Sequence, residues 1–349
     1  MVFFLLKLTK LIKNQKIMAL DKQKHLEKVL ETHDISKHSN IDKFIAKKND
    51  VKTALNQKFS KEKATNAIDS GSYAKYTAIN TKFDIDCCMP FLKKAANSTE
   101  NGFEKLKDMF DAVYDYFKNE YDDEHLVEVR KQRVSIGLQF NIDGHIFDMD
   151  VVPGRERPNN SDYNDNNTDL SLYIHKRSTK EESENKLKIK TNIKKHLGLL
   201  GGEGRKHERK VTKLLKVWKT ERRIQKGGKL IKSFMMELYT KEAFDNNIDS
   251  IPDGLWEKIK MVMNHIIDNI EDNDLVDPAN SSNKISDAMS DTAKSATKSD
   301  MKKTIKEIDE DAEKTKNYFP INEEYNIEEE KRDSHAATSS PILNTSKFG

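Results

Sequence analysis

The sequence predicts an α+β fold in two lobes, with a mixed sheet in the first lobe and only helices in the second. Apolar and polar residues alternate over positions 82–86, 126–140 and 145–152, which is typical of strands. After position 209 the apolar residues recur at helical spacing instead. The glycine-rich segment Gly198–Gly204 lies where the two patterns meet and indicates the joint between the lobes. Strands followed by a run of helices are the usual order of an α+β chain.

The first lobe is expected to begin with helices. Helical spacing of apolar residues predicts them over residues 21–33, 41–63 and 103–117. The apolar stripe of the third helix is most simply explained as core packing. Between the second and third helices, Ser70–Ser72 predicts a turn, and the alternating residues 82–86 predict a strand.

A hairpin is expected to complete the sheet. Residues 126–140 alternate as one strand, and Asn141–Gly144 supplies a turn that favours an antiparallel return. Residues 145–152 form the returning strand, which Pro153-Gly154 is expected to stop. The stretch 159–169, rich in Asn and Asp, predicts a surface loop.

The second lobe and the tail follow from the same patterns. Amphipathic helices are expected over residues 209–226, 230–239 and 255–270, and residues 284–317 continue as a polar helix. The final residues carry too few apolar side chains to fold alone. The expected parts are an N-terminal extension (1–20), a catalytic lobe with N-terminal helices (21–200), a helical lobe (201–317) and a disordered tail (318–349).

The N-terminal extension is expected to be non-native or disordered. Val2–Leu6 resembles the start of a signal peptide, but Lys7 and Lys10 interrupt its apolar core. Met18 is the expected alternative start. The less favoured interpretation is a basic amphipathic stretch that lies on a membrane surface.

Composition limits the classes of function. Charged residues make up 34% of the 349 positions and hydrophobic residues 36%, which indicates a soluble protein. The net charge is only +3, so affinity for phosphate has to come from local placement of Lys and Arg. No apolar run approaches the ~20 residues that cross a bilayer. Cys87 and Cys88 are adjacent and fit small apolar residues in a reducing cytoplasm, the expected location.

Carboxylates on strands carry the chemical signal. Asp84 and Asp86 are two positions apart on the predicted strand and therefore point to the same face. Apolar Phe83 and Ile85 surround them, and carboxylates inside an otherwise buried strand need a compensating partner. Mg²⁺ suits that need because it prefers oxygen ligands, with Mn²⁺ as the alternative ion. A third carboxylate from a later strand, Asp150, allows two ions to lie roughly 3.5–4 Å apart.

The Gly71-Ser72 pair supplies a complementary anion site. Glycine lets the backbone approach a phosphate closely, and the Ser72 hydroxyl and nearby amides bind it. Lys75 adds a positive charge. Taken alone, each pattern also fits a plain turn or a solvated strand end, so the prediction depends on their combination.

Five further blocks of sequence stand out: GSYAKYTAINTKFDIDCCMPF (Gly71–Phe91), FDMDVVPGR (Phe147–Arg155), KLLKVWK (Lys213–Lys219), KSFMMELYT (Lys232–Thr240) and LVDPANSSNKISD (Leu275–Asp287). Together they resemble the CD-NTase enzymes, bacterial relatives of cyclic GMP-AMP synthase and oligoadenylate synthase among the polymerase-β-like nucleotidyltransferases. The blocks occur in the order expected for that family over about 215 residues. One departure is Tyr76, which stands where relatives often have glycine.

The resemblance implies a bilobal polymerase-β-like fold and a set of site residues. Asp84, Asp86 and Asp150 would bind the metal ions and catalyse the reaction. Asp148 lies on the same strand face, and Asp150 is preferred because Val-Val-Pro follows it directly. The residues that would bind nucleotide are Gly71, Ser72, Lys75, Thr77, Lys216, Ser233 and Phe234, the last by stacking on a base.

The resemblance also implies the reaction and the partners. A ribose hydroxyl of one nucleoside triphosphate would attack the α-phosphate of another, pyrophosphate would leave, and a second round would close a cyclic di- or trinucleotide. Relatives make such messengers in anti-phage (CBASS) signalling, where a separate effector binds the product. No membrane and no DNA or RNA template is expected. Some relatives are conjugated at their C-terminus by a ubiquitin-transfer-like enzyme, for which Gly349 would be the site.

Two rival interpretations remain open. The first is a nucleotidyltransferase that modifies RNA ends or a protein, which shares the acids and the Gly-Ser pair but predicts a broad basic face in the RNA case. The second is a catalytically dead nucleotide-binding scaffold. The sequence does not fix the bases, the linkage or the ring size of a product.

Overall fold

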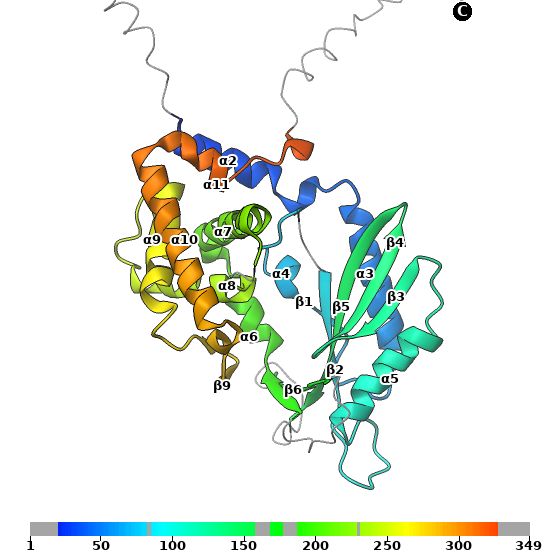
Figure 1. Ribbon diagram of the computed structural model, residues 1–349. Helices are drawn as coiled ribbons and strands as arrows, with labels where there is room; N and C mark the ends of the chain where they lie inside the picture. The colour runs from blue at the N-terminus through cyan, green and yellow to red at the C-terminus, as the bar shows by residue number, and fades with distance from the viewer. Residues whose placement is uncertain (1–19, 82–84, 158–167, 177–186, 229–230, 327–349) are drawn as a thin grey trace, which may run out of the picture.

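A sheet lobe and a helical lobe lie side by side in the structure, a computed structural model that describes residues 20–81, 85–157, 168–176, 187–228 and 231–326 (Figure 1). The prediction of an α+β chain with a mixed sheet and a helical lobe is confirmed. The strands of the main sheet are β1 (Ile68–Ser70), β2 (Ile85–Phe91), β3 (Leu126–Lys131), β4 (Ile136–Ile142), β5 (His145–Glu156), β6 (Leu170–Tyr173) and β7 (Lys188–Thr191).

The two central strands, β2 and β5, are parallel, and the other pairs in the sheet are antiparallel. The strand order is β1-β2-β5-β4-β3, and β6 and β7 continue from the far end of β5. Short helix α4 (Gly71–Ala74) follows β1 directly, so the sequence from Ser70 to Ser72 begins a helical turn that faces the helical lobe (Figure 1).

Two helices, α3 (Ile41–Lys58) and α5 (Leu106–Asn119), pack against the sheet and form the core of its lobe. The Phe44 ring of α3 stacks on Phe147 of β5 with 4.6 Å between centroids. Met109, Phe110 and Val113 of α5 are fully buried, which confirms that the apolar stripe of this helix is core packing. Cys87 and Cys88 are buried free thiols on β2, as expected for small apolar residues.

Two details of the predicted hairpin are wrong. Residues 126–140 form two strands, because Gln132 and Ser135 close a turn in which the Gln132 amide donates to the Ser135 carbonyl at 2.9 Å. Strand β5 also continues through Pro153 to Glu156. Val151 is the last residue of β5 that β4 pairs, and β6 begins to pair at Arg155. Pro153 lies in the gap between them on this side of β5, while on the other side it pairs with Met89 of β2.

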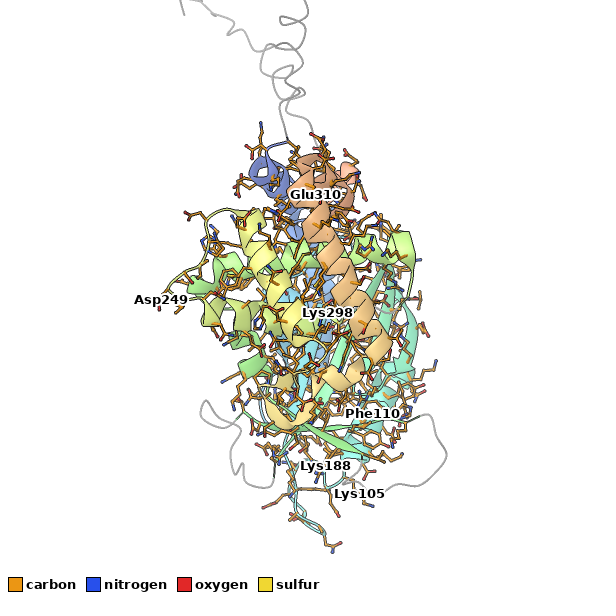
Figure 2. All side chains as sticks on the ribbon, turned by 60° about the vertical axis from the view of Figure 1, so that its left-hand side comes forward. Lys105, Phe110, Lys188, Asp249, Lys298 and Glu310 are labelled. Carbon is orange, nitrogen blue, oxygen red and sulfur yellow. The ribbon has the colours of Figure 1, made fainter. Side chains whose placement is uncertain are left out.

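The helical lobe is built around a second core that contains Trp218 and Trp256. Its elements are α7 (Lys206–Lys226), α8 (Ser233–Asn246), α9 (Leu255–Asn269), α10 (Asp291–Glu310) and α11 (Thr315–Tyr318), with the small hairpin β8 (Val276–Asp277) and β9 (Asn280–Lys284). Helix α6 (Ile193–Gly198) enters this lobe from β7. Figure 2 shows α10 running across the front of the lobe, from Glu310 at the top past Lys298.

Helix α2 (Lys22–Thr32) begins at Asp21, whose side chain accepts from the amide of Lys24 at 3.1 Å. Although it precedes the sheet lobe in the chain, its Leu26 and Val29 are buried in the core of the helical lobe. The expected assignment of residues 21–33 to the catalytic lobe therefore differs from their packing.

The expected boundary at residue 317 also differs from the packing. Phe319 is 0% exposed, and its carbonyl is 2.8 Å from Nε2 of His25 on α2. Residues 318–326 thus continue the helical lobe, and they include a short 3₁₀ turn at Glu323–Tyr325. No helix in the described ranges has the length and apolar character needed to cross a membrane.

Candidate active site

A cavity of about 460 Å³ opens between the lobes, and most of the predicted site residues line it. Five cationic side chains and only two carboxylates lie in its wall, which suits an anionic ligand. The lining residues are Ser72, Lys75, Ala78, Ile79, Asp86, Lys216, Lys219, Thr220, Arg223, Lys232, Ser233, Phe234 and Glu237.

Two of the three predicted carboxylates are neighbours in the sheet. Asp86 of β2 and Asp150 of β5 are directly paired in the parallel register. Partners in register project to the same face, so both carboxylates lie on one side of the sheet. Asp84, the third predicted carboxylate, lies outside the described residues.

The register also distinguishes Asp150 from Asp148. Asp148 pairs with Gln139 across β4 and is held by that side chain at 3.0 Å and by Arg130 at 3.2 Å. Asp150 lies opposite Gly137 and receives hydrogen bonds from Gln132 at 2.8 Å and Ser135 at 3.4 Å. Asp150 is the one that faces Asp86 across the strand pair.

Two glycines create room for these carboxylates. A Cβ on Gly71 would lie 1.7 Å from Oδ2 of Asp86, and the φ of +74° also disfavours other residues there. A Cβ on Gly137 would lie 2.5 Å from Nε2 of Gln132, the group that donates to Asp150. The missing side chains therefore let Asp86 approach the Gly71-Ser72 turn and let Gln132 orient Asp150.

The donor set fits a hard divalent cation. Carboxylate oxygens are the ligands that Mg²⁺ prefers, and Asp86 and Asp150 supply them side by side. The hydroxyl of Ser70, whose residue pairs with Asp86 across β1, is buried and has no hydrogen-bond partner in the described structure. No group of three or more His, Cys, Asp or Glu that could bind a metal occurs among the described residues, which do not include Asp84.

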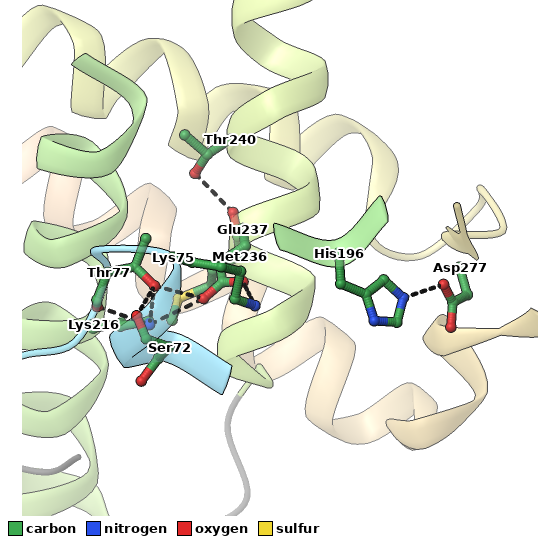
Figure 3. A network of polar contacts seen from close by, with 9 residues as sticks. All are labelled: Ser72, Lys75, Thr77, His196, Lys216, Met236, Glu237, Thr240 and Asp277. Atoms are coloured by element: carbon green, nitrogen blue, oxygen red, sulfur yellow. Dashed lines mark hydrogen bonds and ion pairs between the residues drawn. The ribbon is translucent and has the colours of Figure 1, made fainter. Parts of the chain in front are cut away.

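A buried ion network forms the floor of the cavity (Figure 3). Glu237 of α8 is 2% exposed and forms ion pairs with Lys75 and with Lys216, the latter at 3.1 Å. Lys216 also donates to the carbonyl and the hydroxyl of Thr77, at 2.9 and 3.0 Å. The Thr77 hydroxyl donates to Glu237 at 3.0 Å. This network ties the segment after α4 to both α7 and α8.

The pKa directions follow from burial and charge. Burial by itself would raise the pKa of Glu237, but the ammonium groups of Lys75 and Lys216 outweigh it and hold that pKa below its ordinary value. Burial lowers the pKa of Lys216, although Glu237 opposes this effect. Glu237 is therefore the buried carboxylate that compensates the charges of Lys75 and Lys216.

The lysine that reaches Ser233 is Lys219. Its ammonium donates to the Ser233 hydroxyl at 3.0 Å, at the edge of the cavity. Lys216, one turn earlier, already has three acceptors for its three ammonium hydrogens. The structure thus brings Ser233 together with Lys219. The predicted lysine, Lys216, instead joins Thr77 to Glu237 in the buried network.

Phe234 combines cavity lining with packing. Its half-buried ring lies 5.1 Å from the Lys75 ammonium and meets His196 of α6 edge-on, with 5.1 Å between centroids. His196 is in turn 2.8 Å from a carboxylate oxygen of Asp277 (Figure 3). The Asn283 amide donates to Asp277 at 3.2 Å. The LVDPANSSNKISD block therefore holds His196, which packs against the Phe234 ring.

Sequence reasoning missed three residues of this site. Glu237 was detectable as the one charged residue inside the apolar run of KSFMMELYT. Lys219 was detectable only as one of several lysines on the same helix. Gln132 gave no signal, because its contact with Asp150 depends on the turn before β4.

Comparisons with known proteins agree with this geometry. Residues 18–186 match the model of the SMODS family, the Second Messenger Oligonucleotide or Dinucleotide Synthetase domain. A comparison with curated proteins found no match.

Two solved structures illustrate the shared fold. CdnC of E. coli MS115-1, determined with ATP, is 20% identical with a TM-score of 0.60, covering 82% of this chain and 91% of its own. The CD-NTase CdnG of Bradyrhizobium diazoefficiens, determined with GTP, is 11% identical with a TM-score of 0.62, covering 86% and 96%. Residues 18–186 thus match a SMODS domain, and the chain shares its fold with these CD-NTase structures over both lobes.

Proposed function

We propose that this protein is a Mg²⁺-dependent nucleotidyltransferase that joins nucleoside triphosphates into a cyclic di- or trinucleotide and releases pyrophosphate. The observation that carries the proposal is the pairing of Asp86 with Asp150 beside a cationic cavity between the lobes. Paired carboxylates serve metal-assisted attack on phosphorus, and a cationic wall serves a triphosphate.

The carboxylates are proposed to act with Asp84. Asp84, Asp86 and Asp150 would hold two divalent ions, Mg²⁺ or Mn²⁺, which when bound lower the pKa of the attacking hydroxyl and neutralise phosphate charge. Asp150 is the group that accepts the hydroxyl proton, and the donors on Gln132 and Ser135 keep its oxygens oriented.

The phosphates are proposed to bind along the cationic wall. Ser72, Ser233 and Lys219 contact the triphosphate, because all three line the cavity and Lys219 already meets Ser233. Gly71 allows the backbone to approach, and Arg223 and Lys232 extend the positive surface. Lys75, Thr77 and Lys216 keep this surface in place through Glu237 rather than by direct contact.

The base is proposed to stack on Phe234. An aromatic face is tolerant of base identity and contributes about 1–3 kcal/mol per stacked base. His196, which Asp277 holds, packs edge-on against the ring and thereby orients Phe234.

The deciding experiment is incubation of the pure protein with all four nucleoside triphosphates and Mg²⁺, without RNA, followed by mass spectrometry. We expect a phosphatase-resistant cyclic product that is absent when EDTA removes the metal. Product formation that requires added RNA or protein would favour the transferase rivals. No product, together with retained triphosphate binding, would favour the dead scaffold.

Variants on one strand face provide a matched control. Asp86→Asn and Asp150→Asn should each lower the rate by at least about 100-fold, since each removes a carboxylate at the reacting centre. Asp148→Asn removes the same charge two residues away, where Arg130 holds the carboxylate, and should leave most of the activity. Equal losses in Asp148→Asn and Asp150→Asn would contradict the roles proposed here.

We propose anti-phage signalling as the biological setting, with a downstream effector that binds the product. The support is the SMODS domain matched by residues 18–186 and the likeness to CdnC of E. coli MS115-1, a protein whose structure is also known in complex with HORMA-deltaN. A HORMA-domain protein is thus a partner to test for this chain as well. The expected conjugation at Gly349 lies outside the described residues and stays a prediction.

A further inference from the structure

A second cavity of about 510 Å³ lies on the other side of the segment that follows α4. Its lining residues come from α2 and the residues after it, from that segment, from the connection between α6 and α7, and from the first half of α7: Leu30, Asp34, Tyr76, Gly201, Glu203, Lys206, Arg209, Lys210 and Lys213. None of them lines the cavity described above. The volume lies within the range of small-molecule sites, ~300–1,000 Å³.

Tyr76 presents an aromatic face to this second cavity. Its side chain is 65% exposed, and its φ of +58° is a left-handed conformation that a non-glycine residue rarely adopts. Two backbone hydrogen bonds hold the turn: the Tyr76 amide donates to the Tyr73 carbonyl and the Thr77 amide to the Ser72 carbonyl, both at 3.0 Å. An exposed, strained aromatic residue beside a cavity is the pattern of a binding residue.

The charges around Tyr76 favour an anion. Lys206 and Lys210 form no ion pair with any residue that the structure describes. Lys213 pairs with Asp34 at 3.0 Å, and the Arg209 guanidinium lies 5.7 Å from the Tyr76 ring centre. Arg209 also donates to the carbonyls of Leu200 and Gly202, at 2.7 and 2.6 Å, which fixes it against the joint between the lobes.

We propose that this second cavity binds a mononucleotide, separately from the site between the lobes. The base stacks on the exposed ring of Tyr76, which the Arg209 guanidinium contacts, and the phosphate is bound by Lys206 and Lys210. An aromatic face supplies stacking without strict base preference, and two cations that lack partners supply charge-assisted hydrogen bonds. A single strand of nucleic acid carries the same chemistry, but a cavity of about 510 Å³ has the size of a small-molecule site.

The two cavities share a wall, which couples them; this part rests on the proposed function. Tyr76 lines the second cavity, while its neighbours Lys75 and Thr77 belong to the Glu237 network. On α7, Lys213 faces the second cavity and Lys216, one turn later, contacts Thr77. A ligand that moves Tyr76 therefore moves the segment that positions the first cavity, and nucleotide in either site changes the affinity of the other.

The test is calorimetric titration with AMP in EDTA, using the whole chain. We expect AMP to bind to both cavities of the wild type, and Lys219→Met should weaken binding to the first cavity about tenfold without weakening binding to the second. Lys210→Glu should weaken binding to the second cavity in Lys219→Met by about tenfold or more, the loss of one charge-assisted contact, and Tyr76→Ala should weaken it similarly. Lys302→Glu, the same charge change at an exposed site on α10, is the control.

Each outcome decides the proposal independently of catalysis. A single AMP site in the wild type, or AMP binding that Lys210→Glu and Tyr76→Ala leave unchanged, would overturn the second site even if the enzyme makes product. Binding of a 20-nucleotide single strand but not of AMP would show that the surface recognises nucleic acid instead. Two results together would confirm both proposals separately. Lys210→Glu would lose AMP binding at the second cavity and still make product, and Asp86→Asn would lose synthesis and still bind AMP there.

Discussion

Residues of the same type on one helix have different tasks here. Lys216 and Lys219 lie one turn apart on α7, yet Lys216 is 7% exposed and surrounded by three acceptors, whereas Lys219 reaches Ser233 at the cavity. The difference arises because Glu237 and Thr77 accept the hydrogen bonds of the Lys216 ammonium, whereas the Lys219 ammonium stays at the surface of the cavity. A lysine in a binding cavity is thus assigned by its partners, not by its position in a motif.

Substitution of the two lysines separates these tasks. Lys219→Met should raise the KM for ATP about tenfold or more, since a charged contact to phosphate is lost. Lys216→Met should instead lower the free energy of unfolding by about 1–3 kcal/mol, because Thr77 and Glu237 lose a buried donor. Urea unfolding and steady-state kinetics on both variants check this. A KM effect in Lys216→Met as large as that in Lys219→Met would contradict the assignment.

Helix α2 shows how an element is joined to distant parts of the chain. His25 approaches the Phe319 carbonyl at 2.8 Å, and His33, the residue that ends the helix, approaches the Val29 carbonyl at 3.0 Å. Burial lowers the pKa of both imidazoles, although these hydrogen bonds oppose the shift. Both groups are therefore held neutral in the folded protein.

This burial predicts a pH dependence of stability. The unfolded chain binds protons on His25 and His33 near their ordinary pKa of 6.5, before the folded protein does. Their contribution is thus complete above about pH 6.5 and is lost as the pH falls through the lowered folded values. We expect the urea concentration at the unfolding midpoint to decrease as the pH is lowered from 7.5 to 5.5. This pH interval lies above the range in which carboxylates titrate.

Substitution identifies the groups responsible. In the double variant His25→Gln, His33→Gln, the midpoint should change less over the same interval, because glutamine donates a hydrogen bond without titrating. His145→Gln, at an exposed position at the start of β5, is the control and should keep the wild-type slope. An unchanged slope in the double variant would contradict the assignment.

At the scale of the whole molecule, the helical lobe is closed by segments from both ends of the described chain. Helix α2 and residues 318–319 meet beside α9, where the Phe319 ring lies edge-on to Trp256 with 6.4 Å between centroids. The sheet lobe connects to this lobe through α6 and through the segment after α4, and the latter lines the cavity together with α7 and α8. Each lobe therefore depends on residues that are remote in sequence.

The end of the helical lobe can be tested by truncation. A chain of residues 18–326 should unfold at the same urea concentration as the full chain, because it retains every buried residue that the structure describes. A chain of residues 18–317 loses Tyr318 and Phe319 and should be less stable by about 3–5 kcal/mol, the usual cost of removing a large buried aromatic side chain. Phe319→Ala in the full chain checks the same contact without truncation. Equal midpoints for all four proteins would show that residues 318–319 do not stabilise the lobe.

The sequence by itself determined the features that depend on residues a few positions apart, namely the faces of strands and the positions of helices. Alternation placed Asp86 on a strand and Asp148 and Asp150 on one face of another, because side chains two residues apart in a strand point the same way. Helical spacing likewise located α5, α7 and α9 within a few residues. The order of the motif blocks was enough to indicate the family.

Only the tertiary structure decided which of these residues meet. Asp150 rather than Asp148 faces Asp86 because of the register between β2 and β5, which two distant strands set together. Lys219 rather than Lys216 meets Ser233 because α7 and α8 pack so that Glu237 lies beneath. Tyr318 and Phe319 belong to the helical lobe because Trp256 and α2 leave room for them. Contacts of this kind join segments far apart in the chain, and no local pattern encodes their distance or orientation.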